Sequence, residues 1–91
     1  MRFPVVLHTD DGVRFGVTVP DLPGCFSAGD TFDAALDSAV EAIDLHLEGL
    51  TDDGAEIPVP RPIAEHRANP DFADGVWAFI DVEVSRSGDG V

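Results

Sequence analysis

The sequence contains no lysine and only one cysteine, Cys25, among its 91 residues. Five arginines therefore stand against eighteen acidic residues, and the formal net charge is −13. Proteins hold nucleic-acid phosphates with lysine and arginine, so this balance disfavours direct nucleic-acid binding. It favours a basic protein partner instead, although acidic proteins are also typical of salt-rich cells. A single cysteine cannot close an internal disulfide, which argues against a disulfide-stapled secreted fold.

Long hydrophobic runs are also absent. The N-terminus, MRFPVVLHTDD, has one arginine and a short apolar run before its acidic residues, unlike a signal peptide or a membrane span. We therefore expect a cytoplasmic protein that does not bind membranes. With 44% hydrophobic and 25% charged residues, the chain has the composition of one globular domain with a modest core. We expect the domain to cover residues 1–85 and residues 86–91 to form a flexible tail.

Alternating apolar residues predict four β-strands. Strands over 2–8 and 14–19 flank an Asp-Gly turn and form a hairpin. A short third strand is expected at 25–28 and a returning strand at 76–84. Pro4 has no amide hydrogen, so the first strand either starts there or runs along a sheet edge.

The connector after the hairpin, residues 19–31, reads VPDLPGCFSAGDT. Its prolines and glycines end the hairpin and force a turn, and its Gly-Asp-Thr end supplies an oxygen that caps a helix. Residues 32–50 repeat apolar side chains every three or four positions, which predicts a long helix. A proline-rich extended crossing over 57–62 and a short helix over 63–68 precede the last strand.

This order of elements predicts an α+β fold, with a three-stranded antiparallel meander, a returning strand, one long helix and one short helix. The β-β-β-α-α-β order packs as a two-layer sandwich in which the apolar stripe of the long helix faces the sheet. That stripe consists of Phe32, Leu36, Ala39, Val40, Ile43, Leu47 and Leu50.

A second stripe of the predicted helix is entirely acidic. At about 100° per residue its carboxylates fall on one flank, and the helix has no basic residue to pair with them. Like charges four residues apart destabilise a helix, so this surface is either simply solvated or a docking surface for a basic protein. We call it the acidic flank, and it consists of Asp33, Asp37, Glu41, Asp44 and Glu48.

A third stripe combines small side chains with one leucine, Leu45, roughly opposite the apolar stripe. Small residues let another element approach closely, so this stripe is consistent with a homodimer, a higher oligomer or a partner contact. Single exposed leucines are also ordinary in monomeric proteins. The small residues are Ala34, Ser38, Ala42 and Gly49.

Cys25 would be a nucleophile only if His8, His46 or His66 came within hydrogen-bond reach. No oxyanion-hole motif accompanies it, and a lone cysteine is typically a small buried hydrophobe. We expect Cys25 in the core, His46 at the edge of the apolar stripe, and His8 and His66 at the surface. No ligand-spacing motif links these residues, so we expect neither a metal nor a cofactor.

A metal-dependent nuclease is a separate alternative. A ribonuclease-H-like enzyme places carboxylates on its first strand, first helix and last central strand to hold two magnesium ions. Glu41 and Asp81 match two of these positions, but the first strand has no acid and Asp10 lies in the turn beyond it. Two carboxylates do not hold that metal pair, and we expect no catalytic residue.

The connector and its neighbours resemble a known family. The segments VTVPDLPGCFSAGDTFDAALDSAVEAIDLHLEGL and ADGVWAFIDVEVS, with the proline-rich crossing between them, are similar to the HicB antitoxins of bacterial HicA/HicB toxin–antitoxin pairs. The similarity runs from about Phe3 to Ser85. It implies a degenerate ribonuclease-H-like fold without nuclease residues and a non-enzymatic role. It further implies a partner, a small basic HicA-like toxin that cleaves mRNA, whose catalytic histidine the antitoxin blocks.

The acidic flank is an electrostatic candidate for the toxin contact and does not come from the family. HicB proteins often carry a C-terminal helix-turn-helix or ribbon-helix-helix domain that represses their own operon. This chain stops at SRSGDGV, where that domain would begin, so it is either a naturally short member or a fragment. No DNA-binding role is predicted for these residues. A further alternative is a solitary protein-interaction domain without a toxin.

Overall fold

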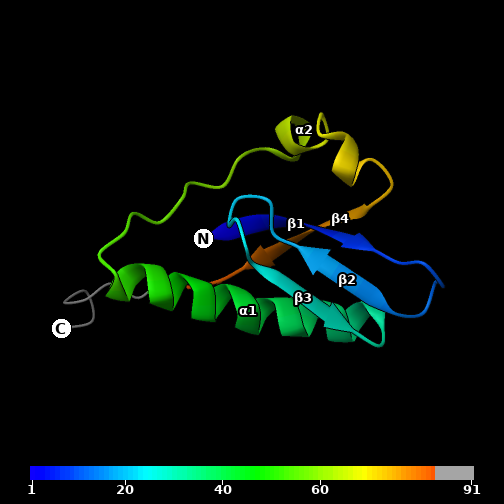
Figure 1. The fold of residues 1–91 in the computed structure, drawn as a ribbon, viewed down its shortest axis with the longest axis horizontal. Helices are drawn as coiled ribbons and strands as arrows, with labels where there is room; N and C mark the ends of the chain where they lie inside the picture. Colours follow the sequence, from blue (N-terminus) through cyan, green and yellow to red (C-terminus); the bar gives the residue numbers. More distant parts are fainter. Residues whose placement is uncertain (84–91) are drawn as a thin grey trace.

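The computed structural model describes residues 1–83 of the chain. The elements follow the predicted order, and Figure 1 shows the long helix along one side of a small sheet. The predicted end of the last strand and the predicted tail fall within residues 84–91, which lie outside the described residues. The elements are β1 (Arg2–His8), β2 (Phe15–Thr18), β3 (Phe26–Gly29), α1 (Phe32–Asp52), α2 (Ile63–His66), the 3₁₀ turn η1 (Pro70–Phe72) and β4 (Val76–Asp81).

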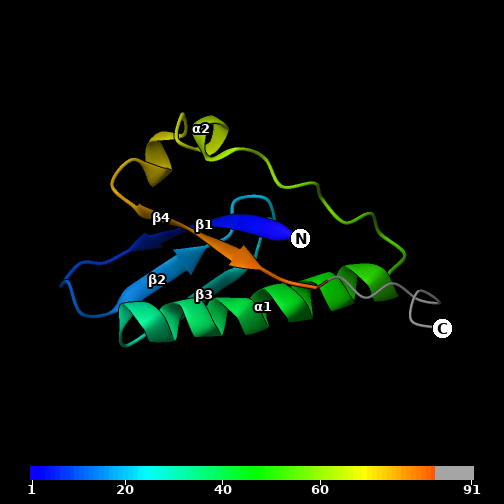
Figure 2. The same ribbon diagram turned by 180° about the vertical axis from the view of Figure 1, so that it is seen from behind.

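The strands form one four-stranded antiparallel sheet in the order β3-β2-β1-β4. β1 pairs with β2, where Leu7 lies opposite Val17. On its other side β1 pairs with β4, where Val5 lies opposite Ala78. β4 therefore returns beside β1 at the edge of the sheet, and α1 lies across one face, as Figure 2 shows from behind. This arrangement confirms the predicted α+β class, the hairpin and the returning strand.

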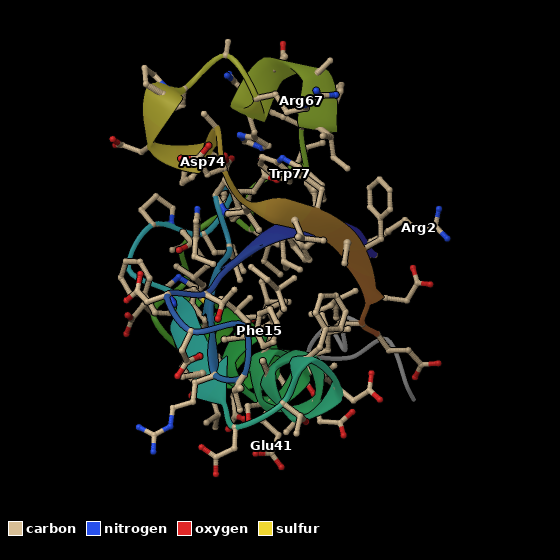
Figure 3. All side chains as sticks on the ribbon, turned by 90° about the vertical axis from the view of Figure 1, so that its right-hand side faces the viewer. Arg2, Phe15, Glu41, Arg67, Asp74 and Trp77 are labelled. Atoms are coloured by element: carbon tan, nitrogen blue, oxygen red, sulfur yellow. The ribbon has the colours of Figure 1, made fainter. Side chains whose placement is uncertain are left out.

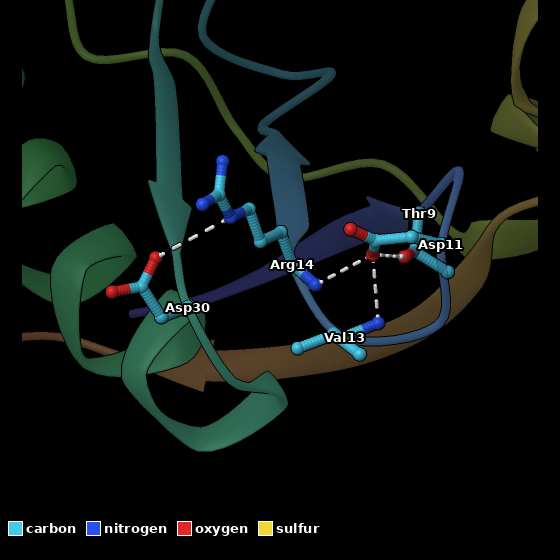
Figure 4. Close-up of polar contacts among 5 residues, drawn as sticks. All are labelled: Thr9, Asp11, Val13, Arg14 and Asp30. Atoms are coloured by element: carbon cyan, nitrogen blue, oxygen red, sulfur yellow. Dashed lines mark hydrogen bonds and ion pairs between the residues drawn. The ribbon is translucent and has the colours of Figure 1, made fainter.

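One carboxylate organises the turn between β1 and β2. The Oδ1 atom of Asp11 accepts hydrogen bonds from the amides of Val13 and Arg14 at 2.8 and 2.9 Å (Figure 4). The Thr9 hydroxyl donates to the same atom at 3.3 Å. These bonds, led by the one from Arg14, stabilise the ionised carboxylate and lower the pKa of Asp11 below its ordinary value of 3.8. The Asp-Gly step thus forms the tight connection that the hairpin needs.

The core lies between α1 and the facing side of the sheet. Its helical members recur every four residues, which is the spacing that keeps side chains on one side of an α-helix. Alternate residues of the strands supply the opposing surface. The core consists of Ala35, Ala39, Ile43 and Leu47 from α1, and of Phe3, Val5, Leu7, Val17, Val19, Leu22, Cys25, Ile80 and Val82 from the strands and connecting segments.

The start of α1 is held closely against β3. The Thr31 side-chain oxygen accepts the amide hydrogen of Ala34 at 3.0 Å and caps the helix, as the Gly-Asp-Thr sequence predicts. A Cβ atom on Gly29 would lie only 2.6 Å from the carbonyl carbon of Ala34, so glycine is required at this approach. The helix continues to Asp52, two residues beyond its predicted end at Leu50.

Pro4 occupies a different place from the one predicted. β1 begins at Arg2 and is a central strand, so Pro4 neither starts it nor lies on an outer edge. The β1–β2 ladder covers only Val6–His8, and Pro4 lies beyond it. Its missing amide hydrogen therefore interrupts no pairing with β2, while on the other side it lies opposite Phe79 of β4.

The segment between α1 and β4 crosses the sheet on the side away from α1, and we call residues 54–75 the strap. Figure 3 shows α1 with Glu41 on one side of the sheet and the strap with Arg67 on the other. The predicted short helix ends at His66 instead of Ala68, and η1 follows it. The strap adds a partial third layer to the expected sandwich, and β1 is buried on both faces from Phe3 to Leu7.

Candidate functional site: the acidic flank of α1

All five carboxylates of the acidic flank lie on the exposed side of α1. The helix turns about 100° per residue, so their spacing places them in one row while the buried stripe holds the other side against the sheet. Figure 3 shows Glu41 at the outer side of the molecule, far from the strap. The structure therefore brings the five predicted residues together on one surface.

This surface has no counterion among residues 1–83. Helix α1 contains no basic residue, and neighbouring like charges on it each cost about 0.2–0.5 kcal/mol of helix stability. Only Asp33, in the first turn, gains from the helix dipole. A basic partner seated on the flank would relieve this repulsion. The arginine ion pairs of the described chain use other carboxylates, in Arg2–Asp81 (3.4 Å), Arg14–Asp30 (4.0 Å, Figure 4) and Arg61–Glu65 (3.9 Å).

The small-residue stripe divides into two parts. Ala34 and Ser38, in the first half of α1, are half-buried, and the close approach of Gly29 shows that β3 packs near this end. Small side chains there serve contacts within the chain. Leu45 is different, since 70% of its surface is exposed, and Gly49 one turn later is exposed as well.

Cys25 is a core residue, as predicted, with 4% of its surface exposed. Burial raises the pKa of its thiol above the ordinary value of 9.0, which is the opposite of what an activated nucleophile needs. None of the hydrogen bonds found within residues 1–83 joins it to a histidine. The structure assigns Cys25 to packing.

The histidines differ partly from expectation. His46 is half-buried, as predicted for the edge of the apolar stripe. The surface prediction for His66 was wrong, because its ring bonds to the buried carboxylate of Asp21 and only 13% of its side chain is exposed. His8 is also half-buried, since the strap passes over it at Gly75.

The carboxylates of the nuclease alternative lie far apart. Asp81 is opposite Arg2 at one end of β1, and Asp10 follows the other end, about 20 Å away for a strand of seven residues. Glu41 points outward from α1. A two-metal site needs its ions about 4 Å apart, which these residues cannot bridge in this arrangement. Within residues 1–83, no group of three or more His, Cys, Asp or Glu side chains could hold a metal ion.

Three comparisons with known proteins bear on the fold and the family of this chain, and the first concerns the family. The model of a family described as "HicB_like antitoxin of bacterial toxin-antitoxin system" matches residues 3–90. The chain belongs to this HicB-like antitoxin family. The PDLPGC connector and the alanine-rich helix, which carry the resemblance in the sequence, both lie inside the matched range, so the predicted membership is confirmed.

Two curated relatives are longer than this chain. An uncharacterised 14.9 kDa protein of Haemophilus phage HP1 is 40% identical over 87 residues, which cover 94% of this chain and 64% of the phage protein. Antitoxin HicB 1 of Photorhabdus laumondii is 34% identical over 65 residues, which cover 71% of this chain and 42% of that antitoxin. The chain thus spans less than two thirds of the length of either relative.

Solved HicB-family structures share the fold. The N-terminal domain of the Burkholderia pseudomallei antitoxin HicB is 38% identical, with a TM-score of 0.79 over 91% of this chain and 99% of that domain. A chain of the HicA3–HicB3 toxin–antitoxin complex is 28% identical, with a TM-score of 0.75 over the same 91% of this chain and 99% of its own length. The HicB N-terminal architecture is therefore the architecture of residues 1–83.

Among the described helices, none is both long and apolar enough to cross a bilayer.

Asp21 is a buried polar residue in the connector, where the sequence predicts only a turn. No local signal marks its partners, which lie 40 and 45 residues further along the chain. Its burial could have been suspected only from its place between hydrophobic Val19 and Leu22.

Proposed function

We propose that this chain is an antitoxin that binds and neutralises a small basic HicA-like mRNA-cleaving toxin by covering its active site. Membership of the HicB-like family supports the antitoxin role. The similar fold of a chain in the HicA3–HicB3 complex supports a toxin as the partner. In this role the protein is not an enzyme, uses no cofactor, binds no nucleic acid through these residues and acts in the cytoplasm.

We place the toxin contact on the acidic flank, and one observation carries this choice. Five exposed carboxylates share one helix surface, and no arginine within residues 1–83 pairs with any of them. A ribonuclease must attract RNA phosphates with positive charge, so a surface of this kind complements it. Complementary charge speeds association to about 10⁸–10⁹ M⁻¹s⁻¹ at low salt and competes with RNA for the same surface.

The antitoxin role is tested by mixing the purified chain with the purified product of an adjacent reading frame that encodes a small basic protein. We expect stoichiometric antitoxin to abolish cleavage of RNA by that protein. Undiminished cleavage at excess antitoxin would remove the proposal. The absence of any such neighbouring gene would favour the remaining alternative, a solitary interaction domain without a toxin.

The contact surface is tested separately by charge reversal. Changing Asp37, Glu41 and Asp44 to lysine should slow association with the toxin about ten- to a hundredfold and flatten its dependence on salt. Stopped-flow or surface-plasmon measurements at two salt concentrations report both effects. The matched control changes three exposed strap carboxylates to lysine, because it alters the net charge by the same amount. Equal effects of the two triple variants would show that net charge matters and the flank does not. The control residues are Glu56, Asp71 and Asp74.

Leu45 supports a second, smaller proposal. A leucine with 70% of its surface exposed, beside the exposed Gly49, is suited to an apolar contact with a second copy of the chain. We expect Leu45→Glu to lower the apparent mass in sedimentation if the chain forms a homodimer or higher oligomer through this helix. An unchanged sedimentation coefficient would assign Leu45 to the solvent or to the toxin interface.

A further inference from the structure

The strap covers one face of the sheet without any fully buried side chain of its own. Helix α2 and the turn η1 contain no buried residue, whereas α1 contributes four. Figures 1 and 3 show the strap leaving the end of α1, running on the side of the sheet away from that helix and returning into β4. The apolar side chains of the strap, such as Ile57, Ile63 and Phe72, are only partly buried, so apolar burial holds the strap less firmly than it holds α1.

A single carboxylate oxygen holds the middle of the strap. Oδ1 of Asp21 accepts a hydrogen bond from the Arg61 amide at 3.0 Å and lies 3.0 Å from Nε2 of His66. Only 3% of the Asp21 side chain and 13% of the His66 side chain are exposed. The other carboxylate oxygen, Oδ2, is buried and has no hydrogen-bond partner within residues 1–83. Hydrogen bonds to a buried carboxylate are strong, and removing them leaves unpaired groups.

Aromatic rings and one glycine secure the end of the strap. The His66 ring stacks on Trp77 of β4, with ring centres 6.1 Å apart, and Phe72 meets the same indole edge-on at 5.9 Å. At Gly75 an added Cβ would collide with a methyl group of Val6, so the strap returns directly against β1. His66 thus joins two attachments, since it bonds to Asp21 and stacks on Trp77.

We propose that the strap opens and closes as one unit over the β1–β4 face, and that Asp21 is the clamp that sets how often it opens. Both partners of Asp21 lie in the strap within six residues of each other, so breaking one bond loosens the other. Opening uncovers Val6 of β1, which is fully buried. Its neighbours Val5 and Leu7 belong to the core under α1, so Val6 lies on the opposite face of the sheet. The strap supplies no buried member of the core under α1, and Ile57 is its one partly buried side chain packed against that core, so opening leaves the buried core in place.

This device goes beyond the proposed antitoxin role and lies on the opposite side of the sheet from the acidic flank. Closed, the strap hides the β1–β4 face. Open, it offers an apolar surface that the closed molecule does not have. The two proposals can therefore be tested separately. A negative result for the clamp would say nothing against toxin binding by the acidic flank, and a negative result for toxin binding would say nothing against the clamp.

Amide hydrogen exchange by NMR on the full chain tests the proposal. The amides of Arg67 and Phe72 bond within the strap, to the carbonyl oxygens of Ile63 at 2.8 Å and Asn69 at 3.0 Å. Single helical turns are not stable in water by themselves, so these two bonds are lost when the strap leaves the sheet. In Asp21→Ala we expect both amides to exchange about ten- to a hundredfold faster, the range expected when hydrogen bonds to a charged group are lost. Amides of the β1–β2 ladder should keep their rates. Asp74→Ala is the control, since it removes an exposed strap carboxylate that makes no hydrogen bond within residues 1–83.

Two hydrogen-exchange results would overturn the proposal. Equal acceleration of strap and sheet amides would make Asp21 an ordinary stability residue, and strap amides already unprotected in the unaltered protein would mean that the clamp does not hold. If Asp21→Ala does not fold, His66→Ala removes only one of the two bonds and must give the same pattern with a smaller factor. Trp77 is the only tryptophan and the chain has no tyrosine, so its fluorescence reports strap opening independently. Asp21→Ala keeps both of the rings that lie beside Trp77, so an Asp21→Ala fluorescence spectrum identical to that of the unaltered protein would count against the clamp.

Discussion

Helix α1 and the strap cover opposite faces of the same sheet by different physical means. α1 inserts four fully buried side chains into a continuous apolar core, whereas the strap relies on two hydrogen bonds to one oxygen and on stacked rings. Apolar burial is non-directional and accumulates over many contacts, about 25 cal/mol for each Å² removed from water. A pair of bonds to one carboxylate is directional and depends on single atoms. The α1 face should therefore carry the global stability, and the strap face should open locally.

The greatest difference in stability is expected between two isoleucine-to-alanine variants, one under α1 and one in the strap. Ile43→Ala empties a fully buried position under α1 and should lower the free energy of unfolding by about 2–5 kcal/mol. Ile63→Ala removes the same atoms from the half-buried first residue of α2 and should cost less than half as much. Urea denaturation of both variants gives the comparison. Equal losses would show that the strap belongs to the same cooperative core.

A smaller contrast comes from the two glycines at close approaches. A Cβ on Gly29 meets the backbone of Ala34 and Ala35, which cannot rotate away, so Gly29→Ala should cost near the upper end of about 1–3 kcal/mol. A Cβ on Gly75 first meets a side chain, that of Val6, and Gly75→Ala should cost near the lower end. Thermal unfolding ranks the two. The reverse ranking would mean that the strap is packed more rigidly than β3 against α1.

The starts of α1 and α2 also differ, because a side chain caps α1 only, and loss of such a cap typically costs about 1 kcal/mol of unfolding free energy. Thr31→Ala removes the side-chain oxygen that caps α1 and should destabilise the protein by about that amount. α2 has no equivalent, because Pro62 at its start makes no side-chain cap. Thr51→Ala, at an exposed position in the last turn of α1, is the control and should stay within about 0.5 kcal/mol of the unaltered protein. A neutral Thr31→Ala would indicate that packing alone fixes the start of α1.

The smallest expected effect is the pH dependence of the β1–β2 turn. Hydrogen bonds lower the pKa of Asp11 in the folded protein, so its contribution to stability is fully present above the unfolded value of about 3.8. The contribution is lost as the pH falls through the lower folded pKa. The stability difference between the unaltered protein and Asp11→Asn should therefore be constant near neutral pH and shrink below about pH 4. Asp10→Asn is the control variant, because it removes a neighbouring exposed carboxylate that accepts none of the hydrogen bonds of the turn. The same pH dependence in both variants would mean that the hydrogen bonds to Asp11 do not cause it.

Local patterns predicted more of the α1 side than of the strap side. The buried stripe Ala39, Ile43 and Leu47 could be read from its helical period, and the cap at Thr31 from its place before that period. The acidic flank followed from the same period, because residues on one helix necessarily share its geometry. Its role in binding a toxin stays a prediction, since exposure and charge describe what a surface attracts and not what occupies it.

The strap could not be predicted in this way. His66 was expected at the surface and Pro4 at a strand start or sheet edge, and both expectations were wrong for one reason. Each residue's environment is set by a segment distant in the chain. His66 is buried against Asp21. Pro4 lies in a central strand because β1 pairs with β4 along its length and with β2 only near its end. A sequence window contains no information about such neighbours.

Local patterns in the sequence were enough to predict the order of elements, the helix with its buried and acidic sides, and the family membership that the connector indicates. These depend on periodicity, on backbone limits of proline and glycine, and on charge, all of which act within a few residues. The burial of Asp21 beneath the strap and the covering of β1 on both faces became visible only in the folded arrangement. The reason is that burial and hydrogen-bond pairing are properties of residues brought together across the fold.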